Sequence, residues 1–215
     1  MSYSIVSVNI GQPQPLAYQK KFVPSGIDKK PVTGSIQLSF FNLDGDGQAD
    51  LVHHGGKDKA LCAYPLEHYS YWESTLGKTF TCGDFGENMT ISGLPETDIH
   101  IGDIFQWGEA IIQLSQPRQP CFKLSAKHGE PQLPKLVEET GYTGYYFRVL
   151  REGIVSADAP LQLLELHPQA ITVEYANRIM HHEKQNAAAM LRLLELPELS
   201  DSWQATLRKR LAALE

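Results

Sequence analysis

The chain has three cysteines, and one of them, Cys121, has unusual neighbours in the sequence. Cys121 lies in residues 115–124, Ser-Gln-Pro-Arg-Gln-Pro-Cys-Phe-Lys-Leu. Each proline fixes φ at about −65° and keeps the residue before it extended, so we expect a stiff approach followed by a short turn or helix beginning at Cys121. Arg118 and Lys123 are close in sequence, and both positive charge and a helix N-terminus stabilise the thiolate that binds metals and attacks electrophiles.

A buried structural role is the usual alternative for a single cysteine. The rigid prolines and the two cations favour a functional role for Cys121. Cys62 lies in an apolar run and is interpreted as core, and Cys82 lies in a polar turn without a neighbouring base or cation. With no C-x-x-C pair, the sequence predicts neither a disulfide framework nor a zinc or dithiol motif, and it indicates a reducing, cytoplasmic location.

Residues 53–59, His-His-Gly-Gly-Lys-Asp-Lys, form a second group with donors for an anion. The two glycines let backbone N–H groups approach a ligand closely, and the lysine and histidine side chains add further donors. We do not expect both histidines to bind one metal ion, because adjacent side chains on a regular element point in different directions. A plain glycine loop remains an alternative. The candidate residues are His53, His54, Gly55, Gly56 and Lys59.

Several familiar functional motifs are missing from the sequence. Residues 44–50 begin like a calcium loop, but Gln48 occupies the fifth position and Gly55 stands where the bidentate glutamate belongs, so a Gly/Asp turn is predicted. There is no G-x-G-x-x-G after a strand, no Walker A motif and no G-x-S-x-G elbow. A zinc or cysteine hydrolase is disfavoured, because there is no H-E-x-x-H and no identifiable base beside Cys121.

Composition points to a soluble globular protein with one full domain and a small appendage. Apolar residues make up 42% and charged residues 20% of the 215, which excludes a disordered or fibrous chain. The net charge of −6 argues against a broadly basic nucleic-acid surface. No stretch approaches the roughly 18 apolar residues of a membrane span, and the N-terminus lacks the features of a signal peptide. Neither nucleic acid nor a membrane is expected as a partner.

The elements that must position these residues are mostly short strands. Alternating apolar residues and Gly/Pro punctuation favour a barrel or sandwich, mainly β with some α. In 31–41, for example, Ile36, Leu38 and Phe40 have the period of two of a half-buried strand. Strands are expected at 4–10, 31–41 and 161–166 and in hairpins pairing 103–107 with 110–115 and 145–151 with 154–156. Helices are expected at 65–76 and 134–140.

The pattern changes near residue 167, where helical segments begin. We expect helices at 171–183, 187–194 and 200–214, with Ser200 as an N-cap and Leu199, Trp203, Leu207 and Leu211 on one face. A helix-turn-helix is one interpretation of three C-terminal helices. Because residues 168–215 carry equal numbers of acidic and basic side chains, a packing or partner-contact unit is favoured over a DNA-binding one.

Six stretches in order resemble the MOSC domain family, most closely its YiiM-type members. The combination is specific because the short motifs surround an R-x-P-C core. The stretches are 25–31 (Ser-Gly-Ile-Asp-Lys-Lys-Pro), 45–50 leading into 53–59, 64–69 (Tyr-Pro-Leu-Glu-His-Tyr), 85–88 (Phe-Gly-Glu-Asn), 101–103 (Ile-Gly-Asp) and 116–121 (Gln-Pro-Arg-Gln-Pro-Cys).

This resemblance implies an α+β protein with a β-barrel-like MOSC core over residues 1–166 and a three-helix extension over 167–215. It also implies the molybdenum cofactor, a molybdopterin, with Cys121 as the protein ligand of the metal. A thiolate suits a thiophilic, high-valent metal, and the phosphate and pterin need cationic and backbone donors. The cofactor contacts that the resemblance implies are Lys29, Gly55, Gly56, Lys59, Asn88 and Arg118. Pyridoxal phosphate is not expected.

The activity implied is reduction of N-hydroxylated compounds, including N-hydroxylated purine and pyrimidine bases such as 6-hydroxylaminopurine, in detoxification. Oxygen is removed from the N–OH group with two electrons, giving the amine and water. His53 or His54 is a candidate proton donor near neutral pH. Since the chain has no iron–sulfur or flavin motif, a separate reductase is expected to supply electrons. The alternative is a non-catalytic carrier of the cofactor or of persulfide sulfur on Cys121. The oligomeric state is left open.

Overall fold

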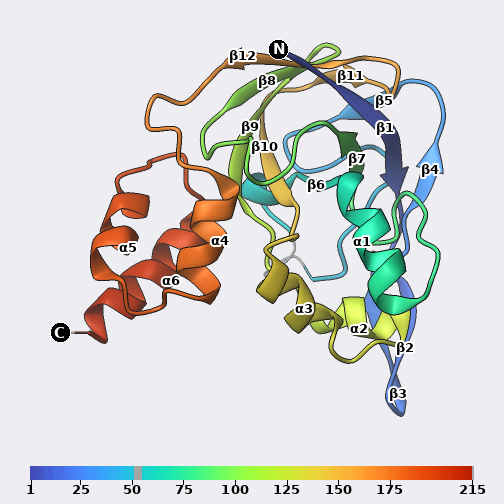
Figure 1. Cartoon of the computed structure of the whole chain (residues 1–215). Coiled ribbons are helices and arrows are strands. Elements are labelled where there is room, and N and C mark those ends of the chain that lie inside the picture. The colour runs from blue at the N-terminus through green and yellow to red at the C-terminus, as the bar shows by residue number, and fades with distance from the viewer. Residues whose placement is uncertain (51–54, 215) are drawn as a thin grey trace.

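A closed β-barrel forms the centre of the protein (Figure 1). The structure is a computed structural model that describes residues 1–50 and 55–214. The strands are β1 (Ser2–Ile10), β2 (Gln14–Tyr18), β3 (Lys21–Ser25), β4 (Lys30–Val32), β5 (Ile36–Leu38), β6 (Leu61–Pro65), β7 (Met89–Ser92), β8 (Ile104–Trp107), β9 (Ala110–Pro117), β10 (Tyr145–Arg151), β11 (Gly153–Val155) and β12 (Leu161–Glu165). The helices are the short 3-10 helix η1 (Lys57–Lys59), α1 (Glu67–Leu76), α2 (Phe122–His128), α3 (Leu133–Thr140), α4 (Val173–His181), α5 (Ala187–Leu194) and α6 (Asp201–Ala212).

The barrel closes where the first strand meets the last. Strands follow one another in the order β12-β8-β9-β10-β6-β7-β1, and β1 then pairs with β12 through Ser2 and Tyr3. β4 pairs with the C-terminal residues of β1, Val8–Ile10, and β2 and β3 form a separate hairpin. Closure leaves the barrel strands without free edges, which removes a template for edge-to-edge aggregation. The prediction of a β-barrel core with α-helices is confirmed.

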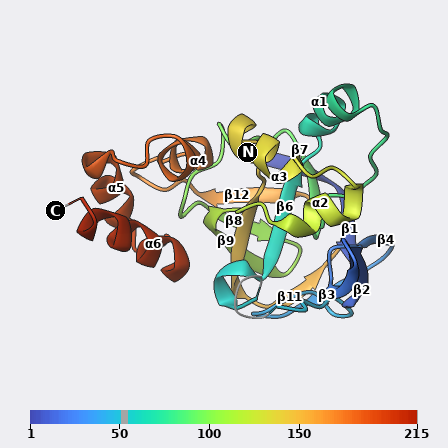
Figure 2. The ribbon, with the colours of Figure 1, turned by 90° about the horizontal axis from the view of Figure 1, so that it is seen from below.

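The barrel core and the C-terminal helices share one buried apolar cluster. Phe105, Trp107 and Phe147 fill the barrel, and Trp203 and Leu207 of α6 belong to the same contiguous cluster. Helices α4–α6 lie together on one side of the barrel, where α4 contacts α3 through His181 and Glu138 (Figures 1 and 2). Helices α4, α5 and α6 each begin at a residue whose side chain caps the helix. These residues are Thr172, Asn186 and the predicted Ser200, respectively.

A second apolar cluster packs α1, α2 and α3 against the barrel. Tyr64 of β6 stacks on Phe85 with ring centroids 4.3 Å apart, and the indole N–H of Trp72 donates to the Tyr64 hydroxyl over 2.6 Å. Leu124 of α2 and Leu133 of α3 are fully buried in this cluster. The position of α2 matters most, because its N-terminus carries Cys121.

Two predicted strand arrangements are wrong. Residues 145–151 and 153–155 do not pair as a hairpin: β10 is held between β9 and β6, so both of its edges are occupied, and β11 pairs with β5. The predicted strand 31–41 is broken at Gly34, which has φ 81°. β4 and β5 lie on either side of the break, and Phe40 lies beyond β5 with an exposed side chain. The hairpin of β8 and β9 is confirmed.

No helix in the described part of the chain is long and apolar enough to cross a membrane.

Candidate functional site

One cavity of about 540 Å³, including its open mouth, brings together residues from distant parts of the sequence. The residues predicted from sequence that line it are Lys29, Lys59, Asn88, Arg118 and Cys121, and Lys123 lines it as well. Four cationic side chains and two thiols, Cys121 and Cys62, therefore surround a single hollow.

Cys121 reaches the cavity because β9 ends in a rigid segment and α2 begins immediately after it. Pro117 is the last residue of β9, and Cys121 is the extended N-cap residue of α2, with φ −132° and ψ 166°. Its side chain is partly exposed and lines the cavity. The short helix predicted to begin at this cysteine is therefore present.

The far end of α2 is tied to the cavity wall by Lys127. The Lys127 ammonium group donates to the carbonyl oxygen of Gly83 over 3.1 Å and lies 3.3 Å from a carboxylate oxygen of Asp84. It also reaches the carbonyl of Ile27, a cavity residue, at 3.4 Å. Burial lowers the pKa of Lys127, and Asp84 opposes that effect. These contacts fix the helix that carries Cys121.

Arg118 is a buried cation that faces the cavity. It is 7% exposed, and none of the described residues forms a side-chain hydrogen bond or ion pair with its guanidinium. Burial acts to lower the pKa of Arg118, but Cys62, Tyr146 and Cys121 raise it above its ordinary value, so the group stays charged. An unpaired buried charge costs several kcal/mol unless a partner arrives. An anion placed in the cavity would be attracted to this buried charge.

Lys29 and Asn88 are held by one buried carboxylate. Asp46 forms an ion pair with Lys29 and accepts a hydrogen bond from the Asn88 amide over 2.9 Å. Its Oδ1 also accepts from the backbone N–H of Gly11 over 2.8 Å. Asn88 in turn accepts from the backbone N–H of Cys62 over 3.1 Å. Asp46, in the segment predicted to be a Gly/Asp turn, thus anchors two predicted cofactor contacts.

The other segment with predicted donors is only partly placed at the cavity. Lys59, the last residue of η1, lines the cavity, and burial lowers its pKa while Asp58 acts to raise it. Gly56 caps η1 with φ 95°, but neither it nor Gly55 belongs to the cavity lining. His53 and His54 lie outside the described residues, so their predicted catalytic role stays a prediction.

Two lining residues with ionisable side chains were missed by the sequence analysis. Cys62 of β6 and Tyr146 of β10 are directly opposite each other in the barrel, and both line the cavity. Burial raises the pKa of the Cys62 thiol and of the Tyr146 hydroxyl, so both groups are neutral at pH 7. Cys62 is buried as expected, but it forms part of the wall beside Arg118. Only the pairing register reveals this, and the apolar run around Cys62 does not.

Comparison with known proteins places the chain in a family. A model of the MOSC domain matches residues 50–162, and a model of the YiiM-like, 3-alpha helix domain matches residues 171–214. The chain belongs to the MOSC domain family. The YflK protein of Bacillus subtilis (strain 168) is 49% identical over 208 residues, which are 97% of this chain and 94% of that protein.

Solved structures and a more distant relative extend the comparison. The crystal structure of YiiM from Geobacillus stearothermophilus is 45% identical, with a TM-score of 0.84 over 97% of this chain and 99% of that one. A protein of Gibberella moniliformis (strain M3125 / FGSC 7600) named "Reductase" is 31% identical over 147 residues, 66% of this chain but only 26% of that protein. This MOSC protein thus shares its whole fold with a YiiM structure, and a segment of 147 residues is similar to part of the protein named "Reductase".

MOSC domains are, as a family, domains that bind the molybdenum cofactor. The residues present fit such a group. The unpaired Arg118, together with Lys59 and Lys123, supplies cationic donors for a phosphorylated ligand, and Cys121 supplies a soft sulfur donor. Among residues 1–50 and 55–214, no three His, Cys, Asp or Glu side chains gather as a metal-binding group. Of the two thiols in the cavity lining, Cys121 is partly exposed and fits direct ligation, whereas Cys62 is buried and burial raises its pKa.

Proposed function

We propose that this MOSC protein is a molybdenum-cofactor-dependent reductase of N-hydroxylated compounds, with N-hydroxylated purine and pyrimidine bases as its substrate class. The observation that carries the proposal is the cavity in which a partly exposed thiol, Cys121, stands beside an unpaired buried guanidinium, Arg118. Membership of the MOSC family and the fungal relative named "Reductase" support it. The net reaction takes R–NHOH, two electrons and two protons to R–NH₂ and water.

In this proposal, the residues of the cavity bind and orient while the cofactor carries the redox step. When bound, the molybdenum cofactor supplies two-electron oxygen-removal chemistry. Arg118 and Lys59 hold its anionic group, and Cys121 ligates the metal. The Asn88 amide donates to Asp46 and to the Asn9 carbonyl, so a cofactor atom would meet only the remaining accepting capacity of its oxygen.

A ring pair next to Cys121 in sequence, outside the cavity lining, offers a surface for a planar substrate. Phe122 directly follows the cysteine, is 43% exposed, and packs on Tyr18 of β2 with ring centroids 4.8 Å apart. A groove between the β2–β3 hairpin and α2 begins at Tyr18 and includes Ser125 and Ala126, which lie on the same helical face as Phe122. Exposed aromatic rings are the surfaces on which nucleobases stack, because every base has a π-face.

Production with and without the cofactor tests the proposal. The protein is expressed in cofactor-competent and cofactor-deficient cells, and molybdenum and pterin are measured per chain. Reduction of 6-hydroxylaminopurine is then followed with an artificial electron donor. We expect close to one molybdenum per chain and turnover only from competent cells, and Cys121→Ser should lose both. Cys82→Ser, at a thiol outside the cavity lining, is the matched control.

Other outcomes of these measurements would contradict parts of the proposal. Stoichiometric cofactor without turnover of any N-hydroxylated substrate would favour the carrier function. Retention of molybdenum and activity by Cys121→Ser would refute the role of the thiol. For the predicted proton donors, His53→Gln and His54→Gln are compared as single and double variants. An unchanged pH profile in the double variant would exclude both histidines.

A further inference from the structure

The C-terminal helices meet the cavity segments at two polar junctions. The first junction centres on Asp58 in η1, next to Lys59. One carboxylate oxygen accepts from the Arg148 guanidinium, with Nη2 at 2.7 Å and Nε at 2.9 Å. The other oxygen accepts from the backbone N–H of Asp201, the first residue of α6, over 3.2 Å. The carboxylate therefore links η1 to the barrel and to α6 at the same time.

The start of α6 also contacts β9 just before Arg118. The backbone N–H of Ser200 donates to the carbonyl oxygen of Ser115 over 3.0 Å. The hydroxyl of Ser202 donates to the side-chain oxygen of Gln116 over 3.2 Å. Ser115 and Gln116 precede Arg118 by three and two residues. One helix end thus holds the segments of both Lys59 and Arg118.

The second junction joins α4 to the turn at residues 141–144. The buried amide of Asn177 donates to the Thr143 hydroxyl over 2.8 Å and to the Gly141 carbonyl over 3.2 Å. The next residue, Gly144, accepts through its carbonyl from the backbone N–H of Arg118 over 3.0 Å. α4 therefore acts on Arg118 through this turn.

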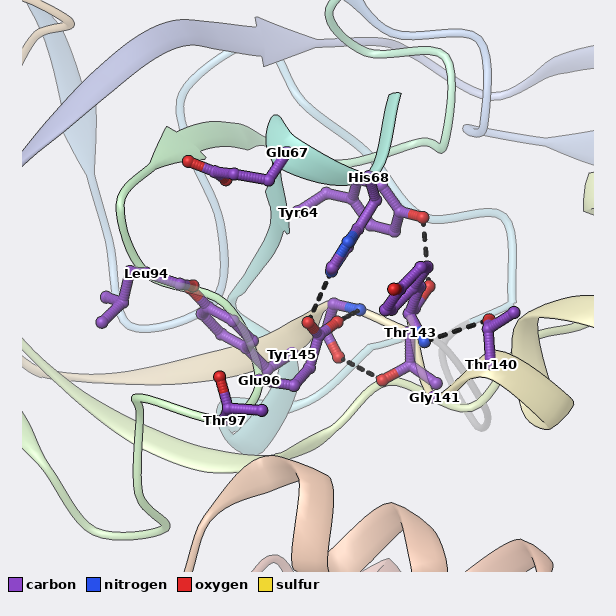
Figure 3. Close-up of polar contacts among 12 residues, drawn as sticks. Tyr64, Glu67, His68, Leu94, Glu96, Thr97, Thr140, Gly141, Thr143 and Tyr145 are labelled. Carbon is purple, nitrogen blue, oxygen red and sulfur yellow. Dashed lines mark hydrogen bonds and ion pairs between the residues drawn. The ribbon is translucent and has the colours of Figure 1, made fainter. Parts of the chain in front are cut away.

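A buried His–Glu pair supports the same turn from the other side (Figure 3). Glu96 accepts from the backbone N–H of Gly144 over 2.7 Å, and its second oxygen lies 2.6 Å from Nε2 of His68 in α1. The backbone carbonyl of Glu96 accepts from the N–H of Glu174 in α4 over 2.9 Å. In Figure 3 the His68 ring and the Glu96 carboxylate point toward each other beside Gly141 and Thr143. The turn is thus clamped between the barrel side and the helices.

We propose that the three C-terminal helices form part of the anion site, because Asp58 and Asn177 position Lys59 and Arg118. Both are positioning residues that act through other residues and do not touch the ligand. The inference rests on the proposed function only in naming the cofactor as the ligand. The coupling between helix docking and anion binding applies to any anion held by Lys59 and Arg118. By linkage, an anion that binds better when the helices are docked must also strengthen that docking.

The test compares two junction variants with a matched control. Asp58→Asn keeps the side-chain size but removes the charge that Arg148 and α6 bind, and Asn177→Ala removes both contacts to the turn. Glu183→Gln breaks an ion pair with Arg178 of 3.0 Å within the helical unit, away from both junctions. Thermal unfolding, the Kd for inorganic pyrophosphate and molybdenum per chain are measured for all variants.

We expect both junction variants to raise the pyrophosphate Kd about fivefold or more, the lower end of usual coupling between sites, and to lower molybdenum per chain. Glu183→Gln should leave both unchanged. In the wild type, pyrophosphate should slow hydrogen exchange at the amides of Asp201 and Glu174, which a merely structural contact would not do. If Asn177→Ala does not fold, the part-exposed Asp58→Asn and the exchange measurement still decide.

Lower melting temperatures with wild-type Kd and unchanged amide exchange would overturn the inference. Pyrophosphate binding without molybdenum uptake in the wild type would refute the proposed function, and the coupling would still be judged by pyrophosphate alone. If the wild type bound neither pyrophosphate nor the cofactor, the cations would not form an anion site and the inference would fail with them.

Discussion

Replacing Arg118 with methionine should stabilise the cofactor-free protein while weakening its anion binding. The guanidinium is 7% exposed and has no ion pair or side-chain hydrogen bond among the described residues. Burial of an unpaired ion costs several kcal/mol, and contact with water in the open cavity recovers part of this. We therefore expect Arg118→Met to raise the free energy of unfolding by about 1–3 kcal/mol. For a chain of this size, that raises Tm by about 2–12 °C.

Urea unfolding and thermal melts of cofactor-free protein measure this gain, and pyrophosphate titration measures the loss. Arg151→Met is the control, because Arg151 is exposed at the end of the same barrel strand that carries Tyr146. Its effect on stability should stay within about 0.5 kcal/mol. If Arg118→Met were less stable than the wild type, the arginine would be a structural residue with a satisfied charge, and the reasoning from its missing partner would be refuted.

Three further substitutions test other parts of the structure. Gly144→Ala should cost at least about 2 kcal/mol in urea unfolding, because φ is 69° and the new Cβ would lie 2.4 Å from the Ala63 carbonyl oxygen; a neutral effect would mean that the turn can move. Burial is the main cause, and neighbouring cationic residues the second, of the lowering of the His181 pKa from 6.5 to about 4. As the pH falls, the unfolded chain therefore takes up the proton on this histidine before the folded protein does. The wild type then loses stability as the pH falls from about 6.5 to about 4. The free energy of unfolding, measured in urea at pH 7.5 and at pH 5, should fall less in His181→Gln than in the wild type. An equal fall in both proteins would contradict this prediction. Phe122→Leu should raise KM for 6-hydroxylaminopurine by roughly 5- to 150-fold while an aliphatic hydroxylamine is unaffected; Phe22→Leu, at an exposed ring of β3, is the control, and equal effects on both substrates would argue against stacking.

Local sequence signals predicted most elements of the fold but not how distant strands pair. The alternation in β8 and β9 and the short turn between them predicted a hairpin that is present. The same logic failed for β10 and β11, because β10 uses both edges for β9 and β6, which come from far away in the sequence. Pairing between distant strands depends on barrel closure, and no local pattern contains that information.

In the candidate site, too, local sequence signals were predictive and contacts between distant segments were not. The prolines and cations around Cys121 are a local signal, and they identified the segment that lines the cavity with Arg118 and Cys121. Tyr146 and Cys62 belong to the wall only because their strands are in register, so their own neighbours in sequence give no sign of it. Asp46 was interpreted as a turn residue, because nothing nearby in the sequence shows that Lys29 reaches it.

The cations of the cavity differ in whether a carboxylate of the protein already neutralises them, and this difference favours one position for a negative ligand. Lys29 already has the buried carboxylate of Asp46, which also fixes Asn88, so this part of the wall is preorganised and close to neutral. Arg118 has no such partner among the described residues. Under the proposed function, a phosphorylated ligand would be drawn toward Arg118, whose segment leads directly to Cys121. The interaction that satisfies the buried charge would then bring the ligand beside the thiol.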